Sequence, residues 1–120
     1  MGRRKALRPR EEGAVAGSLK DALGTARAQL TAGLFFEAHD TLEERWHEIP
    51  SGDLRLAVQG LIQLCAGLHK HSRGEEGGAR YLLGRGLAKL EKTRSALPEG
   101  ASAPFEKAAL RAFASLSEGA

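Results

Sequence analysis

The sequence is rich in alanine and leucine and poor in the residues that favour β-strands. Its 120 residues include 20 Ala and 18 Leu, against only 2 Val, 2 Ile and 4 Thr. Ala and Leu have high helix propensity, whereas strands favour β-branched and aromatic side chains, so the chain has little from which to build a sheet. A chain of this length supports one hydrophobic core. The composition therefore predicts a single all-α domain.

Apolar residues recur at helical spacing in five segments, which Gly and Pro residues separate. We expect helices at about 18–33, 34–48, 54–71, 79–95 and 104–117. The third segment is the most apolar and predicts the central helix. The last segment would turn one face inward, formed by Phe105, Ala109, Ala112 and Leu116. Short connections favour antiparallel neighbours, which predicts a small bundle of four to five helices.

The N-terminal segment, residues 1–17, is rich in Arg, Gly and Glu and has no apolar period. We therefore expect a flexible basic arm there and the bundle domain at 18–120. Five basic residues lie at positions 3–10, and from residue 13 onward 13 basic and 13 acidic residues balance. We expect nucleic acid to contact the chain at most non-specifically, through residues 3–10, because no basic stripe with interleaved aromatic residues follows them.

A cytoplasmic setting fits the apolar pattern and the single cysteine. Cys65 has no second cysteine with which to form an intramolecular disulfide. No continuous apolar run is long enough to span a membrane or to act as a secretory signal. We therefore expect a cytoplasmic protein with no membrane partner.

Segment 34–49 contains an unusual pair of polar residues. On a helical wheel the segment is amphipathic, but His39 and Glu43 lie in the middle of its apolar arc. Burying an imidazole and a carboxylate costs several kcal/mol unless each group has a hydrogen-bond or charge partner. Residues at i and i+4 meet on a helix. The pattern predicts a buried, hydrogen-bonded His39–Glu43 pair next to Trp46.

His69 on the third helix is a candidate third member of this cluster. It shares an angular sector with apolar residues of its helix, so it could converge with His39 and Glu43 if the second and third helices are neighbours. Two His and one Glu form an acceptable ligand set for zinc or another divalent metal. The H-E-x-x-H motif is absent. A metal site and a structural hydrogen-bond network both remain as interpretations.

The stretch 35–46 resembles the H-x-x-x-E-x-x-W signature of the bacterial and archaeal family catalogued as domain of unknown function 309. His39, Glu43 and Trp46 stand at the three marked positions. The segment that ends at Gln63 and the Gly-rich break that follows are also similar to the family, so the resemblance covers about residues 20–95. It implies a small helical bundle and no assigned activity, and it makes Gln63 a further candidate for a ligand or motif residue.

Three classes of function remain open. We favour a ligand-binding, partner-binding or structural domain over an enzyme, because small bundles commonly satisfy a His–Glu pair without chemistry. The alternative is a metal-dependent hydrolase or a proton-transfer enzyme that uses His39, Glu43 and His69. A self-complementary apolar face would favour a two-fold homodimer.

Overall fold

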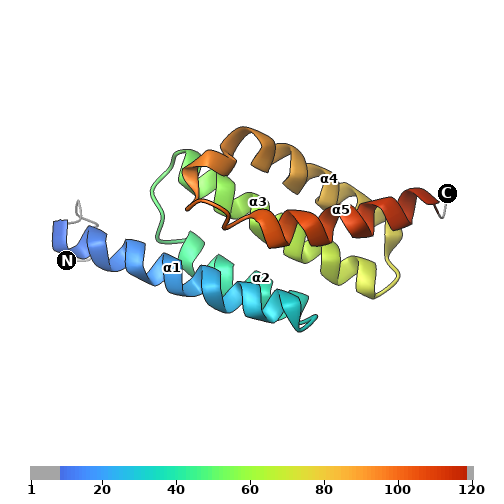
Figure 1. The fold of residues 1–120 in the computed structure, drawn as a ribbon, viewed down its shortest axis with the longest axis horizontal. Helices are drawn as coiled ribbons and strands as arrows, with labels where there is room; N and C mark the ends of the chain where they lie inside the picture. Colours follow the sequence, from blue (N-terminus) through green and yellow to red (C-terminus); the bar gives the residue numbers. More distant parts are fainter. Residues whose placement is uncertain (1–8, 119–120) are drawn as a thin grey trace.

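The structure, a computed structural model, describes residues 9–118. These residues contain five α-helices and one 3₁₀ turn, which are α1 Pro9–Thr31, α2 Phe35–Trp46, α3 Asp53–Ser72, α4 Glu76–Thr93, η1 Arg94–Ala96 and α5 Ala103–Glu118 (Figure 1). No strand occurs within the described range. The prediction of an all-α bundle is confirmed. None of the described helices is long and apolar enough to cross a membrane.

The bundle consists of two helical hairpins and a final helix. Helices α1 and α2 form the first hairpin, α3 and α4 form the second, and α5 packs against α3 and α4 (Figure 1). Gly33 and Gly74 occupy the turns of the two hairpins with φ angles of 80° and 78°. Glycine adopts this left-handed conformation without the steric cost that a Cβ atom brings. These short turns make the paired helices antiparallel neighbours.

Helix α3 is the centre of the core, as its apolar arc predicts. It contacts α2 on one side and α4 on the other, and it also contacts α5. Its side chains without exposed surface are Ala57, Val58, Leu61, Leu64 and Cys65. Burial of side chains of the Val and Leu class stabilises the fold by about 1.5–3 kcal/mol each, before the loss of conformational entropy is subtracted.

Glycines bring α3 and α4 into close contact. A Cβ atom on Gly86 of α4 would lie 2.6 Å from Cδ2 of Leu64 and 2.9 Å from the carbonyl oxygen of Gly60. A Cβ atom on Gly67 of α3 would lie 2.8 Å from the side chain of Leu83. Larger residues at these positions would push the two helices apart. The glycines therefore set the distance between the helices of the second hairpin.

Helix α1 begins earlier than the sequence pattern indicates. The expected start was Ser18, where an apolar stripe begins, but the helix starts at Pro9 and includes the second half of the predicted basic arm. Proline is common in the first turn of helices, because its missing N–H would have no partner there. Ser18 does not cap the helix, since its hydroxyl oxygen accepts a hydrogen bond from Arg45 Nη1 at 2.7 Å. The part of the predicted arm at 1–8 lies outside the described residues.

Helix α5 belongs to the bundle. The four residues predicted to face inward, Phe105, Ala109, Ala112 and Leu116, are all buried. Beside the start of the helix, Arg94 donates two hydrogen bonds to Glu106, from Nε at 2.8 Å and from Nη2 at 2.7 Å. Ser102 donates a third hydrogen bond to Glu106 at 2.6 Å. This group joins the end of α4 to the first turn of α5.

Candidate functional site

The pair His39 and Glu43 lies at the rim of the α2–α3 contact and is not buried. The His39 side chain is 22% exposed and the Glu43 side chain is 45% exposed, so the prediction of a buried pair is wrong. Ala38 and Leu42 fill the fully buried side of α2. The apolar arc of the wheel is wider than the surface that neighbouring helices cover, and even Phe36 remains 51% exposed. Both polar groups therefore keep contact with solvent.

Asp40 joins His39 and Glu43 in one cluster. Nδ1 of His39 lies 3.1 Å from Oδ1 of Asp40 and 3.9 Å from Oε1 of Glu43. One potential ligand atom from each residue lies within 4.8 Å of the others. Helical spacing does not predict Asp40 as a member, because the wheel places its Cα on the polar arc. Its position next to His39 in the sequence was the available signal, since side chains of adjacent residues can turn toward each other.

His69 does not join this cluster. Helices α2 and α3 are neighbours, as the convergence argument required. However, the Phe36 ring is the shared neighbour of the two imidazoles. It stacks on the His39 ring with centroids 5.9 Å apart, and its centroid lies 5.3 Å from that of His69. Among the described residues, the potential ligand atoms that lie close together belong to His39, Asp40 and Glu43, and not to the predicted set of His39, Glu43 and His69.

Trp46 connects the end of α2 to the start of α3. Its indole N–H donates a hydrogen bond of 3.1 Å to the carbonyl oxygen of Arg55. The Arg55 guanidinium lies over the indole ring, 3.8 Å from the centroid. It also donates to the carbonyl oxygens of Trp46 at 3.3 Å and Ile49 at 2.6 Å. The contacts of Trp46 therefore hold the interhelical corner, and no motif had marked Arg55 as its partner.

Gln63 has an unpaired buried acceptor. Its carboxamide oxygen is inaccessible to solvent and has no hydrogen-bond partner among the described residues. Gln59 lies one turn earlier on α3 and accepts a hydrogen bond of 3.0 Å from Lys89 of α4. Partial burial, with a smaller contribution from the Arg85 charge, lowers the pKa of Lys89. Gln63 thus remains a candidate on geometric grounds, on a different helix from the cluster.

Cys65 is fully buried in α3. Burial disfavours the thiolate and raises the pKa of this thiol to about 12. The thiol is therefore protonated at neutral pH, as expected for a packing residue rather than a nucleophile.

A shallow hollow of about 400 Å³ lies beside the cluster. Its lining comes entirely from α2 and the residue that follows the helix, and consists of Asp40, Thr41, Glu43, Glu44 and His47. A second hollow, of about 450 Å³, lies at the other end of the helix, with Phe36 and His69 in its lining. The cluster therefore has an open side that a small ligand could reach.

Fold and site together define a small helical-bundle protein with an open His–carboxylate cluster on its second helix. The chain belongs to the family described as Domain of unknown function (DUF309), whose model matches residues 23–82. That match includes all of α2 and α3 and lies inside the region of the predicted resemblance.

One curated relative is the uncharacterized protein YpuF of Bacillus subtilis (strain 168). It is 32% identical to this chain over 65 residues, which represent 54% of this chain and 37% of YpuF. The matched region therefore spans little more than a third of that relative. No solved structure matches the chain. Neither the family nor the relative indicates a specific biochemical function.

Proposed function

We propose that this protein is a metal-binding domain and that His39, Asp40 and Glu43 hold a divalent cation. The proposal is carried by the proximity of three potential ligand atoms, all within 4.8 Å of one another. Metal–ligand bonds of about 2.1 Å place neighbouring ligand atoms about 3.0–3.4 Å apart. The His39–Asp40 and His39–Glu43 distances of 3.1 Å and 3.9 Å are close to this spacing. Small side-chain rotations would complete the site.

The charge of α2 supports a cationic ligand. The helix contains four acidic residues, Glu37, Asp40, Glu43 and Glu44, against one basic residue, Arg45. One imidazole with two carboxylates suits borderline and hard divalent ions such as Zn²⁺ or Mn²⁺. The Phe36 ring stacked on His39 restricts the imidazole plane. A restricted imidazole loses less rotational freedom when it binds a metal.

The test is metal analysis of the untagged full chain purified without chelator, followed by Zn²⁺ titration calorimetry. We expect about one bound equivalent, and at least tenfold weaker binding in His39→Ala and Asp40→Asn, because each removes one of three protein ligands. The matched control is His71→Ala, which removes an imidazole outside the cluster. Binding that His39→Ala leaves unchanged, or a folded chain that takes up no Zn²⁺, would contradict the proposal.

The hollow beside the cluster favours a second candidate, a metal-dependent hydrolase. In this alternative, Asp40 takes the place that the sequence analysis gave to His69. His39, Asp40 and Glu43 would hold the metal ion, and bound zinc would supply an activated water for hydrolysis. The measurement is turnover of small ester and phosphate substrates by the zinc-loaded chain, with Glu44→Gln as a test of the hollow. Turnover that persists in His39→Ala would exclude this site.

We also propose a reducing cytoplasmic setting, in which a buried and unpaired Cys65 thiol is stable. A two-fold homodimer stays a prediction, and light scattering of the purified chain measures it directly.

A further inference from the structure

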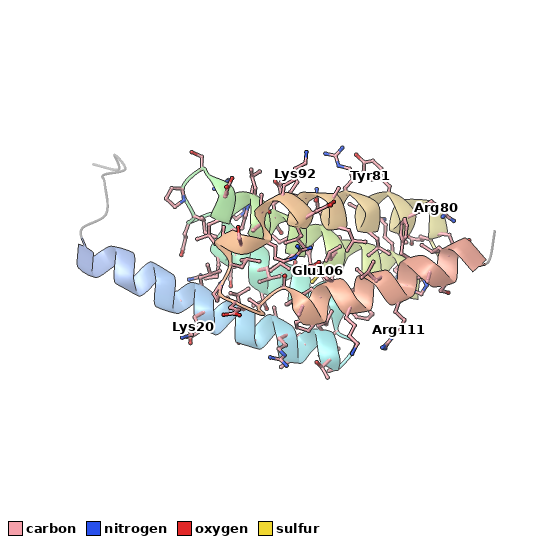
Figure 2. The ribbon with its side chains drawn as sticks, turned by 45° about the horizontal axis from the view of Figure 1, so that its top comes forward. Lys20, Arg80, Tyr81, Lys92, Glu106 and Arg111 are labelled. Carbon is pink, nitrogen blue, oxygen red and sulfur yellow. The ribbon has the colours of Figure 1, made fainter. Side chains whose placement is uncertain are left out.

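The outer side of α4 carries a stripe of exposed residues that no other described helix covers. The stripe consists of Tyr81, Arg85, Ala88 and Lys92 at positions i, i+4, i+7 and i+11, all of them exposed. At 100° per residue they fall within an arc of about 60°. Figure 2 shows Tyr81 and Lys92 projecting from α4 on the same side, away from the other helices. We refer to these four residues as the α4 stripe.

The α4 stripe brings two cations, Arg85 and Lys92, and one aromatic residue, Tyr81, to the same side of the helix. Its members are three or four positions apart along the chain, so the stripe becomes apparent only when the segment is placed on a helix. The opposite side of the helix is buried in the core, where it contributes Ala79, Leu83 and Leu90. The stripe is therefore a separate surface, without a packing role in the described bundle.

Tyr81 gives the stripe an accessible aromatic face. The residue is 62% exposed, more than any other large apolar or aromatic residue in the described part of the chain. The guanidinium of Arg85 lies over this ring, 5.6 Å from its centroid. This cation–π contact places a cationic donor directly beside a flat π surface. A ligand with both an anionic group and a planar ring would satisfy both side chains at once.

Helix α4 also has an excess of positive charge. It contains Arg80, Arg85, Lys89 and Lys92 against Glu76 and Glu91. The lowered pKa of Lys89 includes a contribution from the Arg85 charge, which indicates repulsion between cations on this side of the helix. Helix α2 carries the opposite charge and packs against the other side of α3. An anionic partner would therefore bind to α4 and not to α2.

We propose that the α4 stripe binds a single strand of nucleic acid. Arg85 and Lys92 pair with phosphate groups, and one base stacks on the ring of Tyr81. From Tyr81 to Lys92 the helix rises about 16 Å, enough for about two or three nucleotides of an extended strand. A duplex keeps its bases stacked on each other, so it would leave the Tyr81 ring unused. An acidic peptide would use the cations and not the ring.

The experiment is fluorescence anisotropy of a labelled oligothymidylate titrated with the full chain at about 50 mM salt, where phosphate contacts are strong. We expect Tyr81→Ser to weaken binding about tenfold and Tyr81→Phe to bind within about twofold of the parent, because Phe retains the stacking face. Arg85→Gln and Lys92→Gln together should reduce the salt slope by about 1.4, since two phosphate contacts are lost. The three substituted positions are exposed, and circular dichroism verifies that each variant is folded.

Two controls separate the stripe from other positive charge. Arg111→Gln removes an exposed cation from α5 and should leave the affinity within about twofold. Replacement of Arg3, Arg4 and Lys5 by Gln measures the contribution of the N-terminal segment. The proposal is overturned if no binding occurs, if the N-terminal replacement alone abolishes binding, or if Tyr81→Ser has no effect. Displacement by polyglutamate as effective as displacement by unlabelled oligonucleotide would assign the stripe to an acidic protein instead.

Discussion

The Arg55 guanidinium lies 3.8 Å from the centroid of the Trp46 ring, while the Trp46 indole N–H donates to the carbonyl oxygen of Arg55. The side chain of each residue therefore contacts the other residue. Arg55 also donates to the carbonyl oxygens of Trp46 and Ile49 at the end of α2. The Trp46 carbonyl oxygen also accepts a hydrogen bond of 3.1 Å from the backbone N–H of Ile49. The two residues together close the corner between α2 and α3.

Removal of either partner should destabilise the fold. Arg55→Met removes the side-chain donor to the carbonyl oxygens of Trp46 and Ile49, together with the cation–π contact, so we expect a loss of about 1–3 kcal/mol in the free energy of unfolding. Trp46→Phe, which keeps a ring but loses the indole N–H, should cost less. Urea denaturation monitored by circular dichroism measures both. The matched control is Arg27→Gln on the exposed side of α1, and equal stability of the Arg55 and Arg27 variants would contradict this role.

Gly86→Ala tests the close contact between α3 and α4. The new Cβ atom would lie 2.6 Å from Leu64 and 2.9 Å from the backbone oxygen of Gly60, so the helices must separate. We expect a loss of roughly 1–3 kcal/mol, typical of an overpacked core. Gly77→Ala on the same helix meets no atom within 4 Å and should be neutral or stabilising by up to about 1 kcal/mol. Thermal denaturation of the two variants checks this difference, which disappears if the hairpin is loosely packed.

Glu106 should make stability depend on acidic pH. Hydrogen bonds from Arg94, and to a lesser extent from Ser102, lower the pKa of this carboxyl below its ordinary value of 4.5. A carboxyl whose pKa is lowered by folding contributes its full stabilisation when the pH is above its ordinary pKa. This stabilisation is lost as the pH decreases through the pKa of the folded state. As the pH decreases below about 4.5, the free energy of unfolding should therefore decrease more steeply in the parent than in Glu106→Gln.

The size of this effect is limited by solvent. Glu106 is 15% exposed, but Arg94 is 50% exposed, so we expect about 1 kcal/mol. Urea denaturation across the acidic range provides the curves. The matched control is Glu75→Gln, because Arg73 and Lys70 lower the pKa of Glu75 in the same direction, but the Glu75 side chain is 43% exposed. Parallel pH curves for the parent and Glu106→Gln would show that the Arg94 contact does not contribute.

Glu43→Gln separates a metal ligand from a structural ion pair. The side chain is 45% exposed and lies 3.9 Å from His39, so its charge should contribute at most about 1 kcal/mol to the stability of the metal-free chain. Excess Zn²⁺ should raise the melting temperature of the parent, with about 2.7 kcal/mol of stabilisation at one hundred times the dissociation constant. The variant should lose most of this increase, and His71→Ala should retain it. A large loss of stability without metal would instead indicate a structural pair.

Periodicity predicted the helices and most of the core. The apolar arc of α3 is so wide that only a central position in the bundle could bury it. On α5, the apolar residues Phe105, Ala109, Ala112 and Leu116 predicted the side that faces the core. The start of α1 could not be found in this way, because residues 9–17 extend the helix without adding an apolar stripe. Helix propensity does not mark this segment either, since Gly13 and Gly17 lie within it.

The candidate site was predicted in part. The wheel placed His39 and Glu43 on one side of α2, but it does not show which neighbouring helix covers each sector. The prediction therefore treated His39 and Glu43 as buried, although neighbouring helices leave both side chains partly exposed. Asp40 entered the cluster through its side-chain rotamer, and Arg55 reached Trp46 from another helix. Neither rotamers nor contacts between helices can be read from spacing along one segment.

The order of the helices along the chain has a consequence for how the protein folds. Helix α1 packs against α2, α2 against α3 and α3 against α4, so most of the core joins segments that follow one another in sequence. Low contact order of this kind is typical of chains that fold within microseconds to milliseconds. Each hairpin can form before the other, and α5 can only dock once α3 and α4 have created its groove. In a hydrogen-exchange experiment, we therefore expect the backbone amides of α3 to exchange more slowly than those of α5.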